Sequence, residues 1–211
     1  MKFERYKNYY DIVILPSVEV RDFAIAQSRA IHEHVGSDLV LGERSFKPHV
    51  SLYHVAVKTK NLPEMIWRLR AIVRVQKAVG SLSVQRYENQ PHLAVSKTAW
   101  LARLHQTVLT AINPLRDKSF PNTWKNNWTT YGMTVRAIHL KNIQNYGSPV
   151  VGVIFDPHIT LTVLNDVTVS AKAVDVISNK KLRFTPSAIT ICKIGRYHSC
   201  HKVIAMIPFS V

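Results

Sequence analysis

The spacing of apolar positions along the first half of the chain predicts a buried strand followed by three amphipathic helices. The run "YDIVILP", from Tyr10 to Pro16, is short, apolar and ended by proline, as expected for a buried strand. Apolar residues recur at helical spacing over 20–35, 62–73 and 101–112. Gly36 stops the first of these segments, and Asn61 and Thr98 are candidate N-caps for the other two. Between the first two helices, residues 49–57 read as a strand.

The second half of the chain shows more strand-like spacing. Two alternating runs broken by "ENQP" predict a hairpin within residues 80–97, and residues 114–132 read as a long loop. Further strands are predicted at 133–140, 150–155, 182–194 and 202–209, with a weak helix at 168–177. Helices and antiparallel-looking hairpins mix with little strict βαβ alternation, so the sequence predicts an α+β fold.

One motif, Phe-x-Pro-His-(Val/Ile)-(Ser/Thr)-Leu, occurs twice, as "FKPHVSL" and "FDPHITL". Side chains alternate between the two faces of a strand. His49 and Ser51 would therefore share one face of the first strand, and His158 and Thr160 one face of the second. Two such strands placed side by side would gather two histidines and two hydroxyls around one cleft.

This set of side chains suits in-line attack at phosphorus. A neutral imidazole can take the proton of the attacking oxygen, and a protonated one can give a proton to the leaving oxygen. The hydroxyls can donate to the non-bridging phosphate oxygens. Neither a metal nor a cofactor is required, because histidine titrates near neutral pH. The alternative is two ordinary half-buried strands whose histidines bond locally.

The charge of the chain favours an anionic partner. Its 211 residues include 28 Lys and Arg against 13 Asp and Glu, a formal net charge of +15. Between Asn89 and Phe155 the only acidic residue is Asp117, and no carboxylate side chain follows Asp175. Such a field attracts RNA or nucleotides, although a basic surface that only aids solubility is the alternative.

Two cysteines, Cys192 and Cys200, are too few for a disulfide framework. A cross-strand disulfide between them is one alternative. Because intracellular disulfides are rare, we expect reduced, half-buried thiols. No signal-like or membrane-spanning apolar stretch is present, so we expect a cytoplasmic location, or a nuclear one in a eukaryote, with no membrane partner.

The tetrapeptides "HVSL" and "HITL" resemble the signature of the two-histidine (2H) phosphoesterase superfamily. This resemblance implies a single domain, 1–211, of two pseudo-symmetric lobes, in which two antiparallel sheets flank a central groove and helices lie outside. It implies catalysis by His49, Ser51, His158 and Thr160, with His158 as base and His49 as acid for hydrolysis. These two roles reverse if the substrate binds the other way round. The implied reaction is metal-independent opening of 2′,3′-cyclic phosphate ends of RNA or nucleotides, by what we expect to be a monomer. Cleavage of 2′-5′ linkages, RNA 3′ trimming and a non-catalytic nucleotide- or RNA-binding module are the alternatives.

Several other residues are weaker candidates for the site. Arg196 and Tyr197, in the turn "GRYHSCH", could contact phosphate or base. Trp124 and Lys125, in an aromatic and basic loop, could stack and attract single-stranded RNA. We expect no metal site at His198, Cys200 and His201, because a second ligand cluster is missing. His92 and His105 read as surface or satisfied histidines. His54 lies five positions after His49, which predicts that it faces away from the groove.

Overall fold

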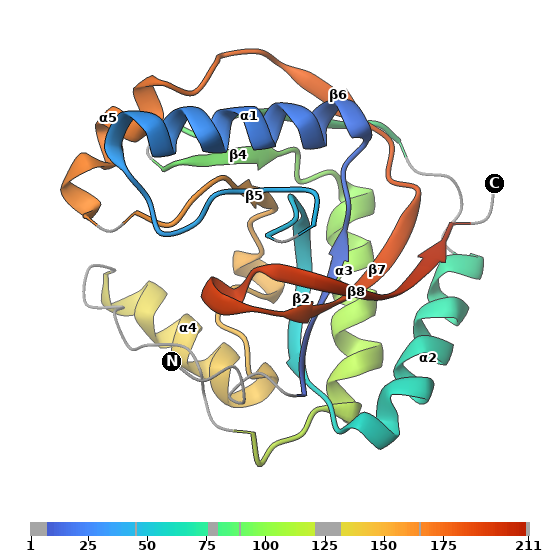
Figure 1. Cartoon of the computed structure of the whole chain (residues 1–211). Helices are drawn as coiled ribbons and strands as arrows, with labels where there is room; N and C mark the ends of the chain where they lie inside the picture. The colour runs from blue at the N-terminus through green and yellow to red at the C-terminus, as the bar shows by residue number, and fades with distance from the viewer. Residues whose placement is uncertain are drawn as a thin grey trace.

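The computed structural model describes residues 8–44, 46–75, 80–88, 90–120, 132–164 and 166–209. Their strands form two antiparallel sheets of four strands each (Figure 1). The first sheet has the order β2-β1-β7-β8, with bounds Val50–Ala56, Tyr9–Ile14, Ala188–Ile194 and Cys200–Pro208. The second has the order β5-β4-β3-β6, with bounds His158–Thr160, His92–Val95, Leu82–Arg86 and Leu182–Phe184. The predicted α+β class is confirmed.

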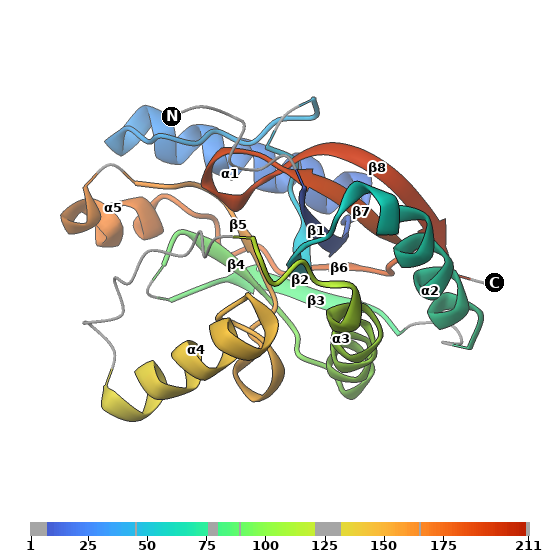
Figure 2. The ribbon, with the colours of Figure 1, turned by 90° about the horizontal axis from the view of Figure 1, so that it is seen from below.

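Helices cover the outer faces of both sheets. The α-helices are α1 (Val18–Val35), α2 (Leu62–Val75), α3 (Ala99–Ile112), α4 (Met133–Tyr146) and α5 (Ser170–Asp175). Short 3₁₀ turns are η2 (Thr59–Asn61), η3 (Asn113–Leu115), η5 (Gly152–Ile154), η6 (Val167–Val169) and η7 (Arg196–His198). α2 and α3 pack on the first sheet. α1 packs beside β6 of the second sheet and also contacts α5 (Figures 1 and 2). Within the described residues, no helix combines the length and apolar character needed to cross a bilayer.

The two repeated motifs lie on the edge strands β2 and β5, which contact each other across the junction of the two sheets. Buried apolar residues of both sheets and of the helices that cover them form one hydrophobic cluster. Burial of this apolar surface fixes both sheets in place and so brings the two motifs together.

The strand predicted over 133–140 is wrong, because these residues form part of α4. Met133 and Val135 have the two-residue spacing of a strand, but these two residues and Leu140 are exposed on the helix. Its stop signal is Gly147, whose φ of 72° lies in the left-handed region that glycine adopts without strain. A helix with few buried apolar side chains leaves no helical period in the sequence, so alternation misled the prediction.

Two other predicted strands differ from the structure. Residues 150–155 contain the turn η5, in which Gly152 has a φ of 66° and Val153 is largely exposed. The single strand predicted at 182–194 is two strands in different sheets, β6 and β7. Pro186 lies between them and cannot donate to a ladder, so the chain leaves one sheet there and enters the other.

Cys192 and Cys200 form a disulfide, so the prediction of reduced thiols is wrong. Both residues are fully buried, and their Cα atoms are 5.4 Å apart across β7 and β8. Antiparallel pairing with an irregular register brings the two side chains together. The low frequency of disulfides inside cells says nothing about this local geometry.

Candidate active site

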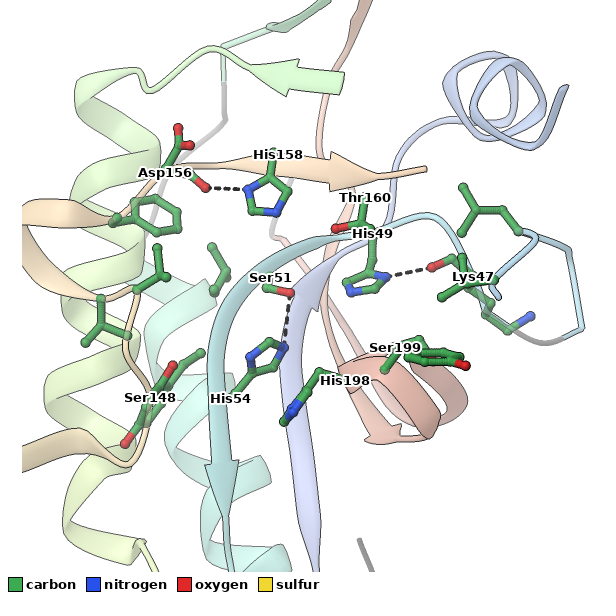
Figure 3. A pocket seen from close by; sticks show the side chains of 18 residues that line it. Lys47, His49, Ser51, His54, Ser148, Asp156, His158, Thr160, His198 and Ser199 are labelled. Atoms are coloured by element: carbon green, nitrogen blue, oxygen red, sulfur yellow. Dashed lines mark hydrogen bonds between the residues drawn. The ribbon is translucent and has the colours of Figure 1, made fainter. Parts of the chain in front are cut away.

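A cavity of about 290 Å³ lies where β2 meets β5, and all four motif residues line it. His49 and Ser51 reach it from the start of β2, and His158 and Thr160 reach it from β5 (Figure 3). On β5 the predicted alternation holds, because His158 and Thr160 are half-buried while Ile159 between them is fully buried. The structure therefore brings together the four residues that the sequence predicted. Apolar side chains form another part of the wall: Leu39, Leu41, Val150, Val151 and Phe155.

Both histidines are oriented by the same local contact. The Nδ1 of His49 lies 2.6 Å from the carbonyl oxygen of Lys47, and the Nδ1 of His158 lies 2.8 Å from that of Asp156. A carbonyl can only accept, so Nδ1 carries the hydrogen in both rings. In the neutral form each Nε2 is then an unprotonated acceptor. The repeated proline precedes each histidine and favours the extended backbone that aims the preceding carbonyl at the ring.

His54 also lines the cavity, so the prediction that it faces away from the groove is wrong. The register between β1 and β2 shifts between Ile12 and Val13, because Ile12 pairs with Tyr53 and Val13 pairs with Ser51. Leu52 is the extra residue of this bulge. A bulge shifts the alternation by one residue, which places His54 on the same face as Ser51.

The sequence reasoning also missed Asp11, a fully buried aspartate on β1. Its Oδ2 accepts a hydrogen bond from the Ser51 hydroxyl at 2.7 Å and lies 2.9 Å from the Nε2 of His54. The Nε2 of His49 is 3.4 Å from the same oxygen. The signal in the sequence was a carboxylate inside the otherwise apolar run "YYDIVI", because a buried charge is unusual.

The two motif histidines have pKa values shifted in opposite directions. Burial by itself lowers the pKa of His49, but the hydrogen bond and negative charge of Asp11 outweigh burial, so the pKa is raised. Burial lowers the pKa of His158, and the positive charges of His49 and His54 add to the effect. Burial also works to raise the pKa of Asp11, yet the contacts with His54 and His49 hold it well below its usual range. Of the two histidines, His49 is therefore the one that holds a proton more tightly, and His158 the one that stays neutral more readily.

His92 packs against His158 behind the cavity and is not one of the residues that line it. It lies opposite Thr160 in the β4–β5 ladder, and its ring stacks on that of His158 with centroids 4.6 Å apart and planes 11° apart. Burial, followed by the charge of His158, lowers the pKa of His92 to about 3. A neutral ring in this position restrains the His158 imidazole without competing for protons. The sequence had suggested only a surface or satisfied histidine.

His105, by contrast, is a satisfied histidine, as predicted. Its Nδ1 donates to the carbonyl of Leu52 at 2.8 Å, and its Nε2 accepts from the N–H of Gly152 at 2.8 Å. Its ring stacks on Phe155, the first residue of the second motif, at 3.9 Å. Phe155 therefore has a packing role: it fixes the segment before His158 against α3.

The weaker candidates have different outcomes. Tyr197 lines the cavity, whereas Arg196 is exposed and lies over the Tyr197 ring at 4.5 Å. Trp124 and Lys125 lie outside the described residues. Cys200 is held in the disulfide and is no thiolate ligand. In the described part of the chain, no group of three or more His, Cys, Asp or Glu side chains is arranged to hold a metal ion.

Comparison with known proteins supports the fold. No family model and no curated protein matches the sequence. Among solved structures, TT0787 of Thermus thermophilus matches with a TM-score of 0.59 at 11% identity, covering 95% of this chain and 97% of that one. The chain therefore shares the fold of TT0787 over nearly its whole length.

Two further structures match more loosely. Usb1 of Kluyveromyces marxianus, alone and with uridine monophosphate, has TM-scores of 0.37 and 0.38 at 16% identity. Each match covers 96% of this chain and 99% of the other. The fold is therefore assigned from the match to TT0787 alone.

Proposed function

We propose that the chain is a metal-independent phosphodiesterase that opens 2′,3′-cyclic phosphate ends of RNA or nucleotides. The observation that carries this proposal is the pair of histidines in one cavity, each with its Nδ1 bonded to a backbone carbonyl. The opposite directions of their pKa shifts fit the two roles. A neutral His158 is ready to accept a proton, and a protonated His49 is ready to donate one. Paired groups whose environments push their pKa values apart are the usual basis of acid and base roles.

In the proposed reaction, the Nε2 of His158 removes a proton from water as the water attacks phosphorus. His49 gives its Nε2 proton to the ribose oxygen that leaves, so that one P–O bond forms and one breaks. Thr160 donates its hydroxyl proton to a non-bridging phosphate oxygen, where negative charge accumulates. The net charge of +15 supports an anionic substrate, and the apolar side of the cavity suits a base or ribose.

The roles of the two hydroxyls differ in this proposal. A serine has one hydroxyl proton, and that of Ser51 is donated to Asp11. While this bond persists, Ser51 cannot also donate to phosphate. Thr160 is therefore the principal hydroxyl donor to the substrate, although the two motifs look equivalent in sequence.

The test is turnover of 2′,3′-cyclic AMP, and of a short RNA with a cyclic phosphate end, in the presence of EDTA. We expect ring opening that is lost in His49→Ala and in His158→Ala and retained in His34→Ala, an exposed histidine of α1. Nucleotide binding should survive in His49→Ala. Binding without turnover by the wild type would instead support the binding-module alternative, and loss of activity on adding EDTA would contradict the metal-independent mechanism.

The pH profile gives a second readout. Activity should fall at low pH as His158 becomes protonated, with an apparent pKa below 6.5, because that pKa is lowered. Activity should fall at high pH as His49 loses its proton, with an apparent pKa above 6.5, because that pKa is raised. A single limb, or a maximum far from pH 6.5, would contradict these roles.

A further inference from the structure

Asp11 occupies an unusual position for a carboxylate. It lies in the centre of a four-stranded sheet, on β1, with neighbouring strands on both sides and no exposed surface. It pairs across the ladder with His54 and shares the groove face of β1 with Val13. A charge in such a place costs much free energy unless it is paired and hydrogen-bonded.

The contacts of Asp11 all converge on the candidate active site. Its Oδ2 contacts Ser51, His54 and His49, at 2.7, 2.9 and 3.4 Å. Its Oδ1 has no hydrogen-bond partner among the described residues. A purely structural carboxylate would be expected to satisfy both oxygens, whereas this one directs a single oxygen at three cavity residues.

We propose that Asp11 is the positioning residue that makes His49 the general acid, with His54 and Ser51 holding the carboxylate in place. This inference deepens the proposed function and rests on it. Since Nδ1 of His49 donates to the Lys47 carbonyl, a proton on Nε2 makes the ring cationic. Asp11 is the anionic group in contact with that nitrogen.

The other charged or titratable groups around His49 do not replace Asp11. They come from β2, the segments before β2 and β5, β5 itself and η7: His54, Lys47, Asp156, His158, Tyr197 and His198. Of these only Asp156 is acidic, and it acts on His158 and bonds to the Tyr87 hydroxyl. Burial is the largest influence on the pKa of His49 and lowers it, and without Asp11 only the hydrogen bond to the Lys47 carbonyl would oppose it.

The distances also allow the proton to leave. The contact of His49 with Asp11, at 3.4 Å, is the longest of the three and therefore the weakest. During ring opening the Nε2–H bond of His49 breaks, an O–H bond forms on the leaving ribose oxygen, and the P–O bond to that oxygen breaks. Asp11 keeps its hydrogen bonds to His54 and Ser51 throughout, so no unpaired buried charge is created.

The experiment compares Asp11→Asn with the wild type across pH on 2′,3′-cyclic AMP. Losing an opposite charge at this range moves a pKa by about 1–3 units, so the high-pH limb should move to lower pH by at least about one unit. Turnover at pH 8 should fall about 10- to 1,000-fold, because each unit removes about nine-tenths of the protonated acid. At pH 5.5 the loss should be much smaller.

A leaving group that needs no proton separates an acid defect from general damage. On a nucleoside p-nitrophenyl phosphodiester, Asp11→Asn should lose far less activity than on the cyclic nucleotide. Asp156→Asn is the matched control, because it removes the other cavity carboxylate but one that acts on His158. In the pH profile of Asp156→Asn, the low-pH limb should move to lower pH and the high-pH limb should not move.

An NMR titration of the His49 imidazole keeps the inference testable whatever the substrate. In the wild type the pKa of His49 should lie above 6.5, and in folded Asp11→Asn it should lie below. An unchanged high-pH limb, or an unchanged His49 titration, would overturn the role of Asp11. A wild type that opens no cyclic phosphate would overturn the proposed function instead, and the titration would still decide the inference. If Asp11→Asn does not fold, a wild-type His49 pKa below 6.5 is the refuting result.

Discussion

His105 should make the folded chain sensitive to acid, and the structure allows the size of the effect to be calculated. Burial, together with the nearby Lys97 charge, lowers the pKa of His105 to about 4, despite the hydrogen bond to the Leu52 carbonyl. In the unfolded chain the pKa is about 6.5. Between these values the unfolded state binds more protons than the folded state, so the free energy of unfolding falls as pH falls. The stabilising effect of a neutral His105 is complete above about pH 6.5.

The magnitude follows from the same two pKa values. At pH 7 the difference in proton binding lowers the free energy of unfolding by only about 0.2 kcal/mol, and at pH 5 it lowers it by about 2 kcal/mol. The ring has a physical reason to stay neutral, since its Nε2 accepts the Gly152 N–H and a proton there would break that bond. Other buried histidines add acid sensitivity of their own, but they are common to the wild type and to a variant at this position.

The assay is urea denaturation of the wild type, His105→Gln and His34→Gln at pH 7 and pH 5. His105→Gln should be less stable at pH 7 by about 1–3 kcal/mol, because at least one buried backbone group loses its partner. Between pH 7 and pH 5 the free energy of unfolding of His105→Gln should then fall by about 2 kcal/mol less than that of the wild type. The exposed His34 variant should follow the wild type. Equal losses for all three proteins would refute a neutral, doubly bonded His105.

Three further outcomes are expected. Thr160→Val should lower kcat by about 10²–10³-fold. Ser51→Ala should lower kcat clearly less, because Ser51 donates to Asp11. Equal losses of kcat would contradict this difference between the two hydroxyls. His92→Phe should keep most of the activity and His92→Ala should lose more, because the stacked ring restrains His158; similar kcat values for both variants would argue against a role for stacking. Replacing Cys192 and Cys200 by serine should lower the free energy of unfolding by about 2–3 kcal/mol from loop-closure entropy, and the native wild type should show no free thiol in the presence of a thiol reagent.

Much of the site could be predicted from local sequence. Alternation on a strand places His158 and Thr160 on one face, and the structure has them so. The order of apolar segments indicated an α+β fold, and the repeated motif indicated paired histidines. The charge indicated an anionic partner. These features depend on neighbours along the chain, so a single sequence contains the information.

Other features depended on contacts between distant segments. The position of His54 follows from a bulge opposite β1, and the role of Asp11 depends on the register between β1 and β2. The helix over 133–146 shows no period because little of its surface is buried. The disulfide depends on how β7 and β8 pair.

The sequence by itself therefore determined which groups could do the chemistry, because residue type and strand periodicity are local. Only the tertiary structure decided how those groups differ. His49 and His158 have the same motif, yet one lies beside a buried carboxylate and the other beside a neutral ring. Burial and nearby charge set a pKa, and both are produced by segments far apart in sequence that fold onto one another.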